Sequence, residues 1–71
     1  MADDNFKISL AAARVNAGLT QEEVAKALGI SKQTIGSWET GKTFPTISRF
    51  QQLCEMYAIP QNYIFLPQEL T

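Results

Sequence analysis

The stretch from Thr20 to Gly41 constrains this chain most, because its residue pattern predicts two short helices joined by a tight turn. Thr20 and Glu23, three positions later, have the spacing of a capping box, in which each side chain accepts a hydrogen bond from the other residue's backbone N–H. Gly29 and Gly41 each follow a helical stretch, where a left-handed cap favours a residue without a side chain. Ser31 is suited to cap the second helix. One helix is therefore expected on each side of Gly29.

Helices are also predicted before and after this segment. Ser9 is a candidate N-cap for a helix over about residues 10–17, and Gly18 follows that helix at the position of a C-terminal cap. Another helix begins near Thr46. A last short helix over about residues 60–65 starts with a proline, which suits the first turn of a helix.

Apolar residues recur at helical spacing along these segments, so each helix is expected to bury one face. The predicted fold class is all-α: a compact bundle of about five short helices in one domain, residues 1–71. Residues 1–5 are expected to be frayed and residues 67–71 to form a tail. The apolar stripes that should build the core are Val24, Ala25 and Leu28; Ile35 and Trp38; and Ile47, Phe50, Leu53, Cys54 and Tyr57.

The composition argues against an enzyme. The chain has no histidine, which removes the commonest general base and metal ligand, and its carboxylates are scattered rather than paired. No catalytic, cofactor or metal motif is present. The single cysteine, Cys54, is expected to be a reduced core residue. Because the sequence shows neither a long apolar run nor a signal peptide, a cytoplasmic protein is expected.

The net charge is −1, but the charges are unevenly distributed. Between Ser31 and Arg49 the chain carries Lys32, Lys42 and Arg49 against Glu39, a balance of +2, while the remainder has a balance of −3. One face of the domain is therefore expected to be basic. A weakly acidic protein with a local positive patch should bind phosphates modestly, with a shallow salt dependence.

Five positions in the central segment are typical of one family: Gln21 at the start of its first helix, the small Ala25, Gly29 in the turn, and the apolar anchors Ile35 and Trp38. With them, residues 9–66 resemble the bacterial and phage Cro and repressor-type helix-turn-helix family, also called the Xre family. The resemblance implies a lambda-repressor-like DNA-binding domain. It also implies a sequence-specific regulator of transcription that binds double-stranded DNA, a repressor of phage or mobile-element type. The alternative is a protein-interaction module, such as an antitoxin-like partner with the same fold.

The outer face of the second motif helix is the candidate base-reading surface. Lys32 and Gln33 lie at its exposed N-terminal end, where Lys32 suits the O6 and N7 of guanine and Gln33 the N6 and N7 of adenine. The base-reading positions of the family fall on the same residues. A solvated surface role is the alternative for both. If Ile35 and Trp38 point inward, the residues facing outward to contact bases are Lys32, Gln33, Gly36 and Ser37, with Thr40 further along.

Gly36 is unusual there, since an exposed glycine within a helix costs about 1 kcal/mol relative to alanine. One hypothesis is that Gly36 and Ser37 make a low ridge that lets the helix sit deep in the major groove, against a thymine methyl group. Neutral sequence drift is an equal alternative.

The resemblance also implies phosphate contacts on either side of the base readers. Gln21 and the backbone amides beside it would clamp one phosphate, Ser31 and Thr34 a second, and the Lys42-Thr43 loop the next. Lys42 is the strongest electrostatic candidate. Ser31 also serves as a cap, and Gln21 has the plainer alternative of a polar first-turn residue.

In this family an arginine in the first helix commonly pairs with an acidic residue near the end of the second motif helix, and Arg14 and Glu39 occupy those positions. The resemblance therefore predicts a structural salt bridge, with Arg14 supporting the fold rather than contacting DNA. Breaking one partner of a partly buried pair would cost a few kcal/mol.

One helix reads only a few base pairs, so a homodimer on a palindromic operator is expected, at least on DNA. The candidate dimer surface is the apolar end of the chain: Tyr63, Ile64, Phe65, Leu66 and Leu70. The equal alternative is that Tyr63, Ile64 and Leu66 fold back under the helix that begins near Thr46.

Overall fold

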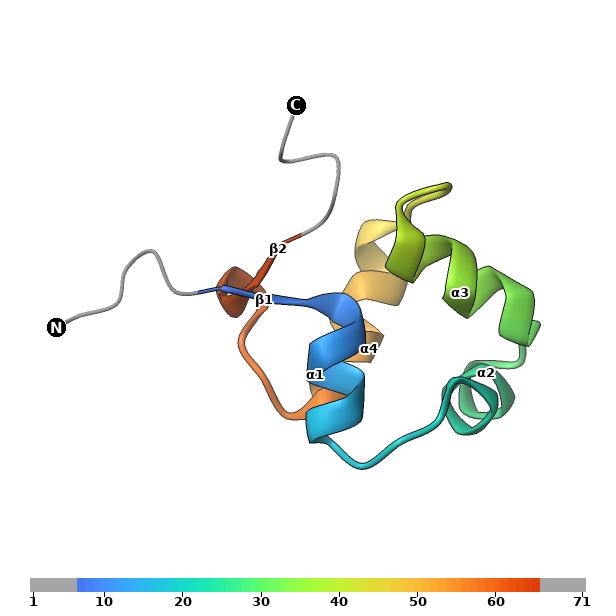
Figure 1. Ribbon diagram of the computed structural model, residues 1–71, viewed down its shortest axis with the longest axis horizontal. Helices are drawn as coiled ribbons and strands as arrows, with labels where there is room; N and C mark the ends of the chain where they lie inside the picture. Colours follow the sequence, from blue (N-terminus) through green and yellow to red (C-terminus); the bar gives the residue numbers. More distant parts are fainter. Residues whose placement is uncertain (1–6, 66–71) are drawn as a thin grey trace, which may run out of the picture.

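The computed structural model describes residues 7–65, which form four α-helices, one short 3-10 helix and a pair of two-residue strands (Figure 1). Residues 1–5 and 67–71, which the sequence assigns to a frayed start and a tail, lie outside the described residues. The elements in chain order are β1 (Ile8–Ser9), α1 (Leu10–Asn16), α2 (Gln21–Leu28), α3 (Lys32–Thr40), α4 (Ile47–Tyr57), the 3-10 helix η1 (Gln61–Tyr63) and β2 (Ile64–Phe65).

Each of the four α-helices begins at a capping side chain. The hydroxyls of Ser9, Thr20, Ser31 and Thr46 each accept a hydrogen bond from the backbone N–H three residues later. The capping box at α2 is complete, because the Glu23 carboxylate also accepts the N–H of Thr20 at 2.8 Å. These caps satisfy N–H groups that have no partner within the helix, and they confirm the predicted starts of all four helices.

The turn between α2 and α3 depends on Gly29, whose φ of 71° lies in the left-handed region. This conformation brings the N–H of Ile30 to the carbonyl of Ala25 at 3.0 Å, which closes α2 and redirects the chain. Ala25 itself is buried in the core. The predicted turn is confirmed.

The core lies between all four helices and includes both expected anchors of α3, Ile35 and Trp38. The α4 stripe contributes Leu53, Cys54 and Tyr57 as buried residues. The prediction for Ile47 was wrong, since its side chain is 77% exposed. Ile47 is the first residue of α4, so the apolar stripe begins before the part of the helix that packs against the core. Phe50 is partly buried against the core.

The segment over residues 60–65 is not the short helix that the sequence predicts. It makes one 3-10 turn and then the strand β2, which pairs in parallel with β1, Ile8 opposite Ile64 and Ser9 opposite Phe65. Ile64 is 2% exposed, so its burial in the core together with the strand pairing outweighs the local helical tendency. The partner strand lies at the other end of the chain and leaves no local signal in the sequence.

The strand pair and the helix-turn-helix lie on different sides of the molecule (Figure 1). In this view α1 and α4 occupy the middle, with β1 and β2 to one side and α2 and α3 to the other. The two ends of the described chain are therefore joined to each other away from α3.

We predict that Ala58→Gly raises the free energy of unfolding by up to about 1 kcal/mol, because Ala58 ends α4 with a left-handed φ of 55°, which strains residues that have a side chain. Urea unfolding measures the change. Ala27→Gly, at an exposed position within α2, is the matched control and should lower stability by about 1 kcal/mol. Equal losses for both variants would contradict the strain at residue 58.

Candidate nucleic-acid interface

The N-terminal end of α3 is presented to solvent while its opposite face is anchored in the core. Lys32 and Gln33 are exposed, and Gly36 and Ser37 are half-buried. Ile35 and Trp38 point into the core and are both buried. The outer face expected from the helical period is therefore present. Contact of its side chains with bases stays a prediction.

The residues expected at phosphates flank this surface. Ser31 and Thr34 are joined by their hydroxyls at 3.0 Å, and the backbone N–H of Thr34 donates to Ser31 Oγ at 3.2 Å. Lys42 and Thr43 are exposed in the loop after α3, where both backbone N–H groups donate to the carbonyl of Ser37 at 2.9 and 3.3 Å. The loop that carries Lys42 is thus held against the end of α3.

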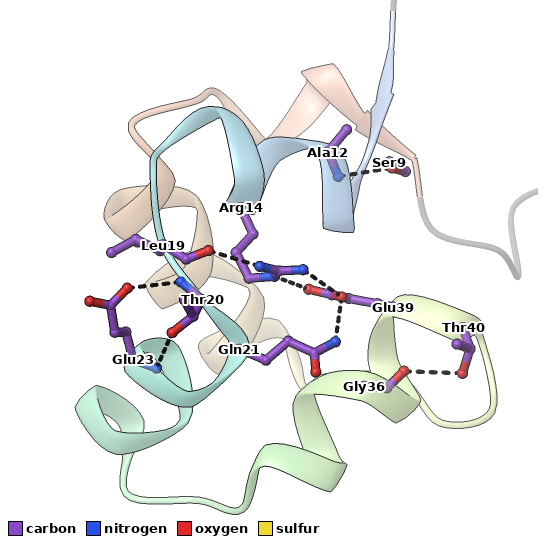
Figure 2. Close-up of polar contacts among 10 residues, drawn as sticks. All are labelled: Ser9, Ala12, Arg14, Leu19, Thr20, Gln21, Glu23, Gly36, Glu39 and Thr40. Atoms are coloured by element: carbon purple, nitrogen blue, oxygen red, sulfur yellow. Dashed lines mark hydrogen bonds and ion pairs between the residues drawn. The ribbon is translucent and has the colours of Figure 1, made fainter.

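The predicted pair of Arg14 and Glu39 is present and forms the centre of a larger network (Figure 2). Arg14 Nε donates to Glu39 Oε2 at 2.7 Å and a second guanidinium nitrogen donates to Oε1 at 3.3 Å. Arg14 also donates to the carbonyl of Leu19 at 2.8 Å, in the connection between α1 and α2. Hydrogen bonding to Glu39 is the main cause that raises the pKa of Arg14.

Gln21 joins the same network, which the sequence did not predict. Its Nε2 donates to Glu39 Oε1 at 2.9 Å, so the first residue of α2 is tied to α3 (Figure 2). One of the two amide hydrogens is used in this bond, so only the other could be donated to a phosphate. A Cβ added at Gly36 would lie 3.8 Å from this Nε2, an ordinary contact distance, so the space beside Gly36 admits alanine.

The positive charge expected between residues 31 and 49 is partly engaged within the protein. An Arg49 guanidinium nitrogen donates to the carbonyl of Leu28 at 3.1 Å and to Gln52 Oε1 at 3.2 Å, which ties α4 to the end of α2. Lys32 Nζ lies 3.9 Å from the Glu22 carboxylate. The contacts of Arg49 with Leu28 and of Lys32 with Glu22 have no local sequence signal, because each joins residues of different helices.

Tyr57 lies in the core beside this network and carries a buried hydroxyl that has no hydrogen-bond partner. Desolvation, followed by the negative charge of Glu39, raises the pKa of Tyr57 to about 12. Burial likewise raises the pKa of the Cys54 thiol. Both residues are therefore neutral at physiological pH, and Cys54 is a buried free thiol, as the sequence predicts.

The helix-turn-helix family model matches residues 10–63. The chain belongs to the Xre-type helix-turn-helix family. It is 28% identical over 65 residues to the HTH-type transcriptional activator BcrR of Enterococcus faecalis, covering 92% of this chain and 32% of the relative. It is 36% identical over 47 residues to the cryptic phage CTXphi transcriptional repressor RstR of Vibrio cholerae, covering 66% of this chain and 42% of the relative.

An uncharacterized HTH-type transcriptional regulator of Methanocaldococcus jannaschii is 35% identical over 51 residues, covering 72% of this chain and 77% of the relative. The chain thus spans less than half the length of the activator and of the phage repressor. No solved structure matches it significantly. The three relatives are all named as regulators of transcription.

Residues 7–65 show neither a membrane-spanning helix nor a cluster of metal-binding side chains. No helix there has the length and apolar character needed to cross a membrane. The same residues hold no group of three or more histidine, cysteine or acidic side chains placed to bind a metal ion.

We predict that Arg14→Met lowers the free energy of unfolding by about 3 kcal/mol, because it leaves the Glu39 carboxylate, whose side chain is 6% exposed, without its cation. Urea unfolding at neutral pH measures the loss. Lys26→Met removes the same charge from an exposed position on α2 and should change stability by less than about 0.5 kcal/mol. Equal stability of the two variants would contradict a structural role for Arg14.

We predict that Tyr57→Phe is neutral or stabilises the fold by up to about 1 kcal/mol at neutral pH, because it removes a buried hydroxyl without a partner. Tyrosine in the unfolded chain ionises near pH 10. Folded Tyr57 has a pKa of about 12 and stays protonated at pH 11. Below pH 10 the free energy of unfolding of the wild type is unaffected by this titration, and it falls as the pH rises from 10 through 12, because unfolding then releases the proton.

The phenylalanine variant should therefore lose less stability than the wild type when urea unfolding is repeated at about pH 11. A clear destabilisation of Tyr57→Phe at neutral pH would mean that the hydroxyl has a partner.

Proposed function

We propose that this chain is a sequence-specific, double-stranded DNA-binding regulator of transcription that reads the major groove with α3. The observation that carries the proposal is the exposed pair Lys32 and Gln33 at the N-terminus of a helix whose other side is fixed by buried anchors and by Glu39. Such an end is the part of a helix-turn-helix that reaches base edges. Family membership and the names of all three relatives support the same function.

The proposed residue roles are those that the resemblance to the family implies. Lys32 and Gln33 contact bases, with Gly36 and Ser37 one turn later against the groove floor. The absence of a side chain on Gly36, beside Gln21, would permit a close approach of α3 to the DNA. The phosphate contacts come from Gln21, Ser31, Thr34, Lys42 and Thr43.

The protein acts as a repressor of phage or mobile-element type in the cytoplasm, and it binds a palindromic operator as a homodimer. Repression is supported by the likeness to the phage repressor, although the activator is also a relative. The dimer surface includes Tyr63, which is substantially exposed, and Phe65, which is half-buried. Ile64 is excluded from this surface because it is buried in the core. Leu66 and Leu70 lie outside the described residues.

The function is tested by selecting duplexes from a random library with the purified protein and measuring affinity for the selected sequence. We expect a two-fold symmetric site with half-sites about one helical turn apart. Gln33→Ala should lower affinity for that sequence by about 1–3 kcal/mol and relax the preference at one base pair of each half-site.

Gln51→Ala, at an exposed position on α4, is the matched control and should leave both affinity and preference unchanged. Enrichment of no sequence, or equal effects of the two alanine variants, would contradict base reading by α3.

A further inference from the structure

An acidic side chain lies beside the leading base reader. Lys32, the first residue of α3, has its Nζ 3.9 Å from Oε2 of Glu22, which belongs to the first turn of α2. Both side chains are open to solvent, 56% exposed for Lys32 and 76% for Glu22. The contact brings the carboxylate to the same end of α3 at which Lys32 would meet DNA.

Few other charges lie near α3, so the Glu22 carboxylate has a large share in the electrostatics of this surface. Among the described residues from 31 to 49, Arg49 is bonded to the carbonyl of Leu28, and Glu39 is paired with Arg14. Arg49 keeps its positive charge but is held at the end of α2, so the exposed cations among these residues are Lys32 and Lys42. A negative charge within 4 Å of Lys32 therefore offsets part of the attraction that this surface offers to a phosphate.

We propose that Glu22 determines specificity by holding Lys32 until a guanine takes its place. This inference rests on the proposed function. In the free protein and on DNA of unrelated sequence, Lys32 stays paired with the carboxylate. On the operator, the guanine O6 and N7 accept from Lys32 and release it.

The exchange favours the operator for a physical reason. An exposed ion pair is weak, so two acceptors on one base edge are enough to replace it. To a phosphate the Lys32–Glu22 pair offers no net charge, so it gives little attraction. The neutral guanine edge needs only N–H donors, and an ammonium has three of them. Glu22 thus weakens binding to every sequence, but it weakens binding to the operator least.

The test uses Glu22→Gln with two duplexes of equal length, the selected operator and a scrambled sequence, over a range of salt concentrations. We expect affinity for the scrambled duplex to rise by about tenfold and affinity for the operator to rise less, so that their ratio falls. The slope of log affinity against log salt for the scrambled duplex should steepen by about one, because Lys32 is free to displace a counterion.

Glu55→Gln, which removes the same charge from an exposed position on α4, is the matched control and should leave the ratio unchanged. A double-mutant cycle then assigns the effect to the pair. In a Lys32→Met background, Glu22→Gln should no longer alter the ratio or the slope.

The inference is overturned if Glu22→Gln and Glu55→Gln behave alike, or if the effect of Glu22→Gln persists without Lys32. In both cases the wild type still binds its operator, so the proposed function stands. A wild type that binds the operator no better than the scrambled duplex overturns the proposed function, and with it this inference.

Discussion

The arrangement of this domain depends on one nearly buried carboxylate. Glu39 of α3 accepts hydrogen bonds from Arg14 of α1 and from Gln21 of α2, so three helices meet on its two oxygens. A buried charge without such partners would be strongly destabilising. The network therefore restricts how α3 lies relative to the helices behind it, and a fixed α3 is what a base-reading surface requires.

The same network limits what the outer surface offers to DNA. Arg14 supports the fold, and Gln21 uses part of its hydrogen-bonding capacity inside the protein. Arg49 is bound to the end of α2. With Lys32 close to Glu22, the surface around α3 is weakly charged, which agrees with a net charge of −1. Base contacts would then supply more of the binding free energy than the general attraction between cations and phosphates.

Much of the candidate site follows from local sequence. Ile35 and Trp38 are three residues apart, and this spacing puts Gln33 on the opposite side of the helix. Lys32 lies to the side of the helix and is exposed because it is the first residue of α3. The pairing of Arg14 with Glu39 was expected only through the resemblance to a family. The bond from Gln21 to Glu39 and the approach of Glu22 to Lys32 were not foreseen, because both depend on the angle between α2 and α3.

The sequence by itself determined where the four α-helices begin and how the central turn forms, since an N-cap at Ser31 or a left-handed Gly29 involves only neighbouring residues. Tertiary structure decided the features that depend on distant partners. Ile47 repeats at helical spacing yet is exposed, because at the start of α4 it projects beyond the described residues that pack against the helix. Residues 64–65 form a strand because they pair with Ile8 and Ser9, and that pairing exists only once the two ends of the domain have come together.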